Sequence, residues 1–432
     1  MHPGKRGLLL TAFAFGVSTC LCGCRAAPGA LTARALPSPV SGIGLVPQVT
    51  ALAADKMLVS WQSPLEGGGY SFLMAVGDGD AWSEPRTIAS GPDLSMFSAD
   101  LPGVATLPGG ELLAFWELKD MRDGDPYATA IQVSCSTDEG RTWSPASRPY
   151  GDALAGQHSF LSWFPASEGI GLVWLDACER SMARHAAMSH GADRHGEDMG
   201  SVGLRHAALS REGRLVRETF VAPITCECCP TSAAVTARGP VVVYRGRQDP
   251  PGTKPSDVRC DQPTVRDIFI TRLEGERWTR PHRVHADDWV IAACPDNGPA
   301  VDASQNDVAV AWWTRAGGAP QVRAAFSQDA GETFGPAVRV DSGKGEGQAT
   351  IALLPGGERA VVGWLEEGQT WARIVTADGA IGPALALGPS PLHSRLPKWT
   401  ADDQRVVAVW TGKLTDHPHV QVSQLSLAPT RP

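Results

Sequence analysis

The segment Gly298-Pro-Ala-Val-Asp-Ala-Ser-Gln-Asn-Asp-Val-Ala-Val-Ala-Trp312 contains two short apolar strands with a polar turn between them, and it ends in a tryptophan. Turn residues between runs of β-branched and small apolar residues predict a β-hairpin. The segment Gly103–Trp116 has the same arrangement. The hairpin is therefore a unit that the chain repeats.

Apolar strands that end in a tryptophan or tyrosine, which we call aromatic anchors, recur along the chain. They are Trp61, Trp116, Trp174, Tyr244, Trp312, Trp364 and Trp410. The interval from one anchor to the next holds three or four strands, which is the size of a propeller blade. Amphipathic helical periodicity is almost absent, and 47 glycines and 34 prolines supply the turns that an all-β chain needs. The sequence predicts an all-β propeller that forms a single domain over residues 43–432.

Two turns carry a more specific pattern, in which Ser, Asp, Gly and Thr alternate with other residues before an aromatic residue. They are Ser136-Thr-Asp-Glu-Gly-Arg-Thr-Trp143 and Ser327-Gln-Asp-Ala-Gly-Glu-Thr-Phe334. The Ser and Asp side chains can bond to backbone amides of their own turn, the glycine takes a positive φ, and the aromatic ring packs between blades. We interpret these turns as folding devices and not as catalytic groups.

These two turns match the Asp-box, and nearly the whole mature chain resembles the bacterial sialidase-like propellers with Asp-box (BNR) repeats. Four stretches are similar to an exo-sialidase lipoprotein subgroup with a C-x-C-C motif. They are Cys226-Glu-Cys-Cys-Pro-Thr-Ser232, Tyr244-Arg-Gly-Arg247, Arg266-Asp-Ile268 and Cys294-Pro-Asp-Asn-Gly-Pro299. The resemblance implies six blades, whereas seven anchors are present. We therefore expect a sialidase-like β-propeller of six or seven blades.

The first residues have the features of a bacterial lipoprotein signal. Lys5 and Arg6 precede an apolar stretch that is too short to span a bilayer, and Leu21-Cys-Gly-Cys24 fits a lipobox. We expect a signal peptide over residues 1–23, lipidation of Cys24, and a Pro/Ala-rich tether over residues 24–42 that lends a strand to the last blade. The predicted location is the cell envelope, with an outer-membrane anchor facing the periplasm or the surface. The alternative is a secreted or periplasmic protein cleaved after Ala35.

The direction of the strands places chemically useful residues on one face of the propeller. Residues just after an anchor converge on the face opposite the Asp-boxes. In the resemblance to sialidases, arginines on this face would bind a substrate carboxylate, for which a rigid bidentate fork is suited. The candidates are Arg245, Arg247, Arg266 and Arg315 with Asn297 for binding, Asp267 or Asp176 as the acid, and Tyr244 as the nucleophile. Alternatively, the arginines pair with acidic residues of neighbouring blades, and Tyr244 only packs as an anchor.

The enzymatic activity is left open by the sequence. An Arg-Ile-Pro motif and a clear Tyr/Glu catalytic pair are missing from it. The expected function is either an exo-sialidase or glycoside hydrolase, or a non-catalytic binder of an anionic glycan. A net charge of -8 argues against nucleic acid as a partner. No cofactor is expected, and the oligomeric state stays open.

Cysteines on the same face suggest a second class of function. In an oxidising compartment, six cysteines predict three disulfides, which join the C-x-C-C cysteines to three distant ones. The six are Cys178, Cys226, Cys228, Cys229, Cys260 and Cys294. The alternative is a copper or zinc site formed by Cys226, Cys228 and Cys229 with His185 and His190, because sulfur and imidazole suit these metals. Cys135 lies in a strand and is expected to be a buried core thiol.

Overall fold

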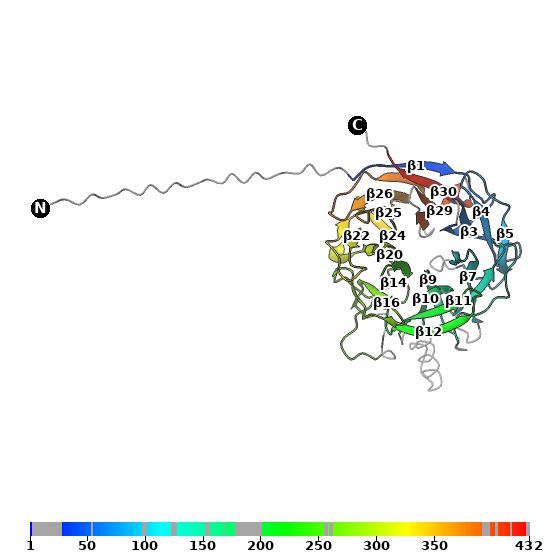
Figure 1. Ribbon diagram of the computed structural model, residues 1–432, viewed down its shortest axis with the longest axis horizontal. Coiled ribbons are helices and arrows are strands. Elements are labelled where there is room, and N and C mark those ends of the chain that lie inside the picture. Colours follow the sequence, from blue (N-terminus) through cyan, green and yellow to red (C-terminus); the bar gives the residue numbers. More distant parts are fainter. Residues whose placement is uncertain are drawn as a thin grey trace.

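The computed structural model describes residues 1, 28–52, 55–96, 102–121, 128–151, 156–167, 169–177, 201–254, 258, 262–390, 398–401, 405–414 and 417–428. Within these residues, seven antiparallel sheets follow one another around a ring, and each is one blade of a β-propeller (Figure 1). The prediction of an all-β propeller is confirmed, and the number of blades is seven.

The first three blades are formed by consecutive segments of the chain. Blade 1 contains β2 (Leu45–Ala51), β3 (Met57–Pro64), β4 (Tyr70–Gly77) and β5 (Arg86–Gly91). Blade 2 contains β6 (Gly103–Thr106), β7 (Leu112–Lys119) and β8 (Thr129–Ser136). Blade 3 contains β9 (His158–Ala166), β10 (Gly169–Asp176), β11 (Gly203–Ser210) and β12 (Leu215–Ala222).

The next three blades continue this order. Blade 4 contains β13 (Ser232–Thr236), β14 (Gly239–Arg245), β16 (Ile268–Glu274), β17 (Arg277–Trp278) and β18 (His282–Arg283), and a small separate sheet pairs β15 (Thr264–Val265) with β19 (Val290–Ile291). Blade 5 contains β20 (Ala300–Ser304), β21 (Asp307–Thr314), β22 (Gln321–Ser327) and β23 (Val338–Arg339). Blade 6 contains β24 (Gly345–Leu353), β25 (Arg359–Glu366), β26 (Gln369–Thr376) and β27 (Leu385–Pro389).

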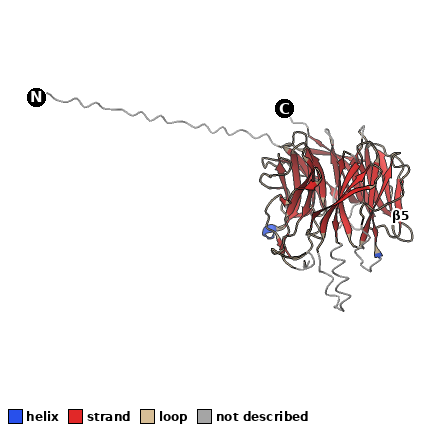
Figure 2. Ribbon diagram, turned by 60° about the horizontal axis from the view of Figure 1, so that its bottom comes forward, coloured by secondary structure: helices blue, strands red, loops and turns tan. Residues whose placement is uncertain are grey.

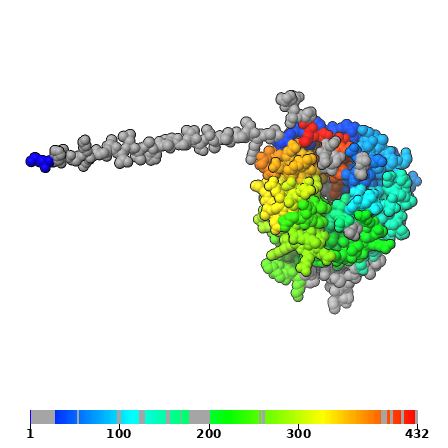
Figure 3. Space-filling model, viewed as in Figure 1, coloured from blue at the N-terminus to red at the C-terminus, as the bar shows by residue number. Residues whose placement is uncertain are grey.

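Blade 7 joins the two ends of the described chain. It contains β28 (Lys398–Ala401), β29 (Val406–Leu414), β30 (His417–Leu427) and the N-terminal strand β1 (Leu31–Leu36). Strand β1 pairs with β30 in a register that places Leu31 opposite Leu427. Figure 3 shows the blue N-terminal strand against the red C-terminal strand. The N-terminal segment therefore adds a strand to the last blade, and this pairing closes the ring.

The aromatic anchors hold neighbouring blades together. All seven lie on the second strand of their blade and are buried. Trp364 of blade 6, for example, belongs to the same apolar cluster as Val322 and Phe326 of blade 5. Because each anchor fills the space between two sheets, the repeat in the sequence becomes a repeat in the packing.

The Asp-boxes form the local turns that their sequence predicts. In the first box, Gly140 N donates to Ser136 Oγ at 2.8 Å, and Thr142 N donates to Asp138 Oδ1 at 2.8 Å. Gly140 has a φ of 80°, which a side chain rarely tolerates. The second box repeats these bonds around Ser327 and Asp329. The interpretation of both turns as folding devices is confirmed.

Antiparallel pairing separates two faces of the ring. Strands run between the faces, and loops connect them at both ends (Figure 2). Both Asp-box turns follow the third strand of their blade, whereas Arg245 ends the second strand of blade 4 beside the start of its third strand. We call the first side the Asp-box face and the other the cysteine face, which carries Cys226, Cys228, Cys229 and Cys294. Among the described residues, no helix is long and apolar enough to cross a membrane.

Candidate functional site

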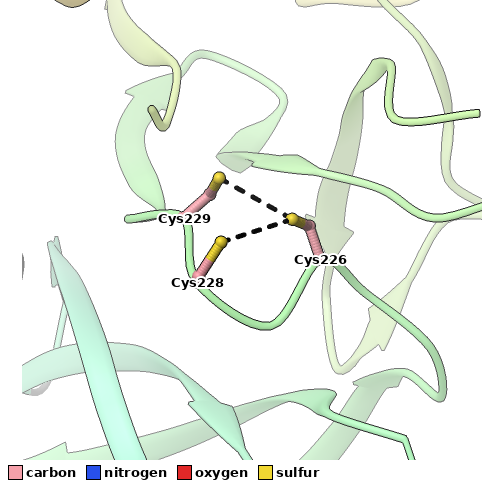
Figure 4. Close-up of side chains that lie close together, drawn as sticks. All are labelled: Cys226, Cys228 and Cys229. Atoms are coloured by element: carbon pink, nitrogen blue, oxygen red, sulfur yellow. Dashed lines mark hydrogen bonds between the residues drawn. The ribbon is translucent and has the colours of Figure 1, made fainter. Parts of the chain in front are cut away.

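Three cysteine sulfurs lie close together on the cysteine face, in the loop between blades 3 and 4. Cys226 Sγ lies 3.9 Å from Cys228 Sγ and 3.7 Å from Cys229 Sγ. Figure 4 shows the three side chains pointing toward one another. Their sulfur atoms all lie within 4.8 Å of one another. Cys226 and Cys229 are buried and Cys228 is half-buried, so the cluster extends from the interior toward the surface.

The loop is tied to blade 4 by its backbone. Cys226 N donates to Arg245 O at 3.0 Å, immediately after β14 ends. Thr225 Oγ1 donates to Val202 O at 2.9 Å on the side of blade 3. The first cysteine is therefore fixed between two blades, and the next three residues turn back over it.

The three thiols differ in acidity because their surroundings differ. Burial raises the pKa of Cys226, but hydrogen bonds from Cys228 and Cys229 and the charges of Arg266 and Arg245 hold it well below its usual range. The pKa of Cys228 is raised by its hydrogen bonds to Cys226, Cys229 and Cys294. Burial and the neighbouring Cys226 raise the pKa of Cys229. Of the three thiols, Cys226 is thus the most acidic, and the sulfurs of Cys228 and Cys229 lie within hydrogen-bond distance of it.

Arg266 interacts with both Cys226 and an acidic partner. Its side chain is fully buried, with Nη1 at 2.9 Å from Glu227 Oε2 and Nε donating to Thr264 Oγ1 at 2.8 Å. Its Nη2 atom is buried without an oxygen acceptor among the described residues. Burial alone would lower the pKa of Arg266, but the charges of Cys226 and Glu227 raise it. The guanidinium is therefore a permanent counter-charge to the Cys226 sulfur.

Arg245 is occupied by the protein backbone. It donates from Nε and Nη2 to Asn297 O at 3.0 and 2.9 Å, from Nη1 to Arg266 O at 2.7 Å, and from Nη2 to Trp313 O at 2.7 Å. The guanidinium also lies 5.2 Å from the centre of the Trp289 ring. This side chain joins three separate segments of the chain, and its guanidinium is not available to a ligand.

The other predicted binding residues are also engaged with the protein. Arg247 forms a bidentate ion pair with Asp249, from Nε to Oδ2 at 2.7 Å and from Nη2 to Oδ1 at 2.8 Å. Asn297 accepts a hydrogen bond from Gln348 N at 2.7 Å. Arg315 is exposed and donates to Gly318 O in its own loop. The structure thus brings Arg245, Arg247 and Arg266 near the cysteines, each with protein partners, and leaves Arg315 outside this group.

The predicted catalytic residues are buried in protein contacts. Tyr244 packs against Phe269 with ring centres 6.1 Å apart, and burial raises its pKa, which opposes a role as nucleophile. Burial also raises the pKa of Asp267, which accepts hydrogen bonds from Trp289 N and Arg283 Nη1. Asp176 is 4% exposed and lies 3.1 Å from Arg205 Nε.

None of the five described cysteines forms a disulfide. Cys294 is exposed, and its thiol donates to Glu227 Oε1 at 3.9 Å. The expected disulfide of Cys294 with a C-x-C-C cysteine is therefore not found. Cys135 is a buried core thiol, as predicted, and burial raises its pKa to about 11. The remaining predicted residues, Cys24, Cys178, Cys260, His185 and His190, lie outside the described residues.

Sequence reasoning missed Glu227, which contacts Arg266, Cys294 and, at 3.9 Å, Arg247 Nη1. Its position between Cys226 and Cys228 was the available signal, because an acid inside a cysteine motif must find a cation when it is buried.

A second feature is a central cavity of about 360 Å³, lined by the first strands of the blades. Its polar residues include Gln48, Thr50, Thr231, Asp302 and Lys398. Burial lowers the pKa of Lys398 to about 8.

No family model matches this chain, and no curated protein matches it in sequence. Solved structures are similar to it in fold at low identity. The polysaccharide lyase Uly1 has a TM-score of 0.50 at 10% identity, over 88% of this chain and 89% of that one. A Penicillium chrysogenum alpha-L-arabinanase complexed with arabinobiose has a TM-score of 0.48 at 14% identity, over 92% and 98%. A Trypanosoma rangeli sialidase has a TM-score of 0.43 at 10% identity, over 79% and 56%. At such identities, the likeness shows the propeller fold alone.

Proposed function

We propose that the protein binds one thiophilic d10 ion, Cu(I) or Zn(II), through Cys226, Cys228 and Cys229. The observation that carries this proposal is the spacing of the sulfurs, 3.7 and 3.9 Å. A tetrahedral ion with metal–sulfur bonds of about 2.3 Å places its sulfur ligands roughly 3.8 Å apart. A disulfide would need a distance of about 2.05 Å. The sulfurs are thus spaced as ligands of one ion and not as a covalent pair.

The charges around the sulfurs support the same function. Metal ligands must be thiolates, and a nearby cation favours the deprotonated form. Arg266 and Arg245 already hold the pKa of Cys226 well below its usual range. Soft thiolates select Cu(I) and Zn(II) over hard cations. The site is therefore prepared for such an ion before the ion arrives.

Metal analysis of the purified protein tests this proposal. The protein is reduced, loaded anaerobically with Cu(I) or with Zn(II), and freed of loose metal on a desalting column. We expect one ion per chain, and loss of that ion in Cys228→Ser, the least buried of the three positions. Cys135→Ser removes a core thiol elsewhere and serves as the matched control, which should keep the ion. Circular dichroism and thermal unfolding verify that both variants are folded. Retention of the ion in Cys228→Ser and also in Cys226→Ser would overturn the proposal.

A second candidate function is the binding of an anionic glycan in the central cavity. A volume of 360 Å³ falls within the usual range of ligand pockets, and Lys398 adds a cation to the polar lining. Calorimetry with sialyllactose tests this candidate, with Lys398→Met as the variant and the exposed Lys344→Met as its control. Binding that Lys398→Met abolishes and Lys344→Met retains would support it. Equal binding by the two variants would exclude this cavity.

We also propose that the chain is a cell-envelope lipoprotein anchored through Cys24. The lipobox Leu21-Cys-Gly-Cys24 supports this assignment. Fractionation of the native host should find the protein with the membranes, and Cys24→Ala should release it. A Cys24→Ala protein that stays in the membrane fraction would refute the anchor.

A further inference from the structure

Cys294 is a fourth thiol beside the cluster, and it differs from the other three in exposure. It precedes Asn297, whose carbonyl group is bound by Arg245, so the loop that carries it is fixed against blade 4. Its thiol reaches Glu227 Oε1 at 3.9 Å and also interacts with Cys228. Exposure falls from Cys294, which is exposed, through half-buried Cys228 to buried Cys226 and Cys229. The four sulfurs thus form a path from solvent to the interior.

We propose that Cys294 is the exchange ligand through which the ion passes between solvent and the three-cysteine site. This inference rests on the proposed metal-binding function. The three cysteines of the loop form a compact set of sulfurs within 4.8 Å of one another, and Cys294 is not a member of that set. It contacts the set at its most exposed member, Cys228, while hydrogen-bonding to Glu227. This is the position of a residue that binds the ion transiently.

The exchange conserves charge and electrons. The Cys294 thiol loses its proton to solvent and bonds to the incoming ion while a sulfur ligand of the donor leaves. Bonds from the ion to Cys228, Cys226 and Cys229 then form, and each of these sulfurs releases to solvent any proton that it still carries. The bond to Cys294 breaks at the same time, and Cys294 takes a proton from solvent. The ion keeps its oxidation state throughout, so neither an oxidant nor a reductant is required. The reverse sequence releases the ion.

Glu227 positions the two ends of this path. Its Oε2 atom accepts a hydrogen bond from Arg266, while its Oε1 atom accepts the hydrogen bond from Cys294. One carboxylate therefore keeps the exposed thiol beside the cluster. The partner that this arrangement suits is a carrier that holds its ion with thiolates or thioethers, because such ligands exchange through a shared sulfur-bound intermediate.

Exchange kinetics of Cys294→Ser test the inference. Wild-type protein, Cys294→Ser and the control Ala293→Ser, which places the same hydroxyl on the adjacent exposed residue, are each loaded with one Cu(I) anaerobically. A chromophoric Cu(I) chelator measures the affinity at equilibrium and the rate of removal. We expect Cys294→Ser to bind one ion with unchanged affinity, and to load and release it about tenfold more slowly, because a pre-positioned nucleophile is lost. Ala293→Ser should behave as wild type.

Two results would overturn the inference and leave the metal site intact. Unchanged rates in Cys294→Ser would show that the ion passes without this thiol. Weaker affinity with faster release would show that Cys294 is a permanent ligand. Failure of the wild-type protein to bind Cu(I) or Zn(II) would instead overturn the proposed function and this inference together. The measurement of stoichiometry therefore separates the two failures.

Discussion

Arg245→Met tests whether the arginine that best resembles a carboxylate-binding residue is a structural element. The native guanidinium makes four hydrogen bonds to three backbone carbonyl groups, those of Arg266, Asn297 and Trp313. Methionine has a similar length and an apolar stem, but it donates no hydrogen bond. Each buried acceptor left unsatisfied costs about 1–3 kcal/mol. Three acceptors, partly rehydrated in the variant, predict a loss of about 3–5 kcal/mol in the free energy of unfolding.

Urea denaturation followed by tryptophan fluorescence measures this loss. Arg315→Met is the matched control, because Arg315 is exposed and, among the described residues, its side chain bonds only to Gly318 O in its own loop. Removing it should change the free energy of unfolding by less than about 0.5 kcal/mol. If Arg245→Met were as stable as Arg315→Met, the three carbonyl groups would not depend on the guanidinium. Such a result would refute the structural role of Arg245.

Three further predictions concern other parts of the molecule. Burial, and then the charge of Arg217, lower the pKa of His206 to about 4. His206 therefore contributes about 3 kcal/mol to the free energy of unfolding above pH 6.5, and this contribution is lost as the pH falls toward 4. His206→Gln should remove this dependence on pH, which urea denaturation at each pH measures. Asp329→Ala should lower the melting temperature, because Thr333 N loses its acceptor, and an unchanged melting temperature would contradict a folding role for the Asp-box. Deletion of residues 28–36 should also lower the melting temperature, because β30 loses β1 as its partner; a deletion variant that melts like the full chain would show that blade 7 closes without it.

The fold could be predicted because its signals are local and repeated. Each aromatic anchor and each Asp-box indicates its own blade, so a wrong prediction for one blade does not affect the prediction for the next. The Asp-box needs only residues within one turn, such as Ser136 and Thr142, and its bonds follow from the sequence alone. The resemblance to sialidases implied six blades, whereas the number of aromatic anchors, seven, equals the number of blades. Closure by β1 was suggested by the tether, but its register depends on β30, almost 400 positions away.

The face that carries the candidate site could be predicted from the sequence, but the hydrogen-bond partners of its residues could not. The direction of the strands placed the C-x-C-C loop and the arginines on one face. In an antiparallel sheet, the end of one strand and the start of the next lie at the same edge, so the residues there share one face. The partners of the arginines could not be derived in this way. Arg245 bonds to a carbonyl 52 positions away and to another 68 positions away, and Arg266 pairs with Glu227 across 39 positions. Backbone carbonyl groups have no signature in the sequence, so an arginine that binds them looks the same as one that binds a ligand.

The arginines and the cysteines of this face form one electrostatic unit. Arg245, Arg247 and Arg266 are buried; Arg247 pairs with Asp249, and Arg266 pairs with Glu227. An excess positive charge in the protein interior is costly unless an anion lies nearby. Hydrogen bonds from Cys228 and Cys229 and the charges of Arg266 and Arg245 hold the pKa of Cys226 well below its usual range, although burial acts in the opposite direction. The basic residues that suggest a carboxylate-binding site are therefore bound to groups of the protein itself, and they lie beside the sulfurs of the proposed metal site. A cysteine whose pKa is lowered in this way suits the soft cation that we propose, whereas the guanidiniums beside it stay bound to the protein.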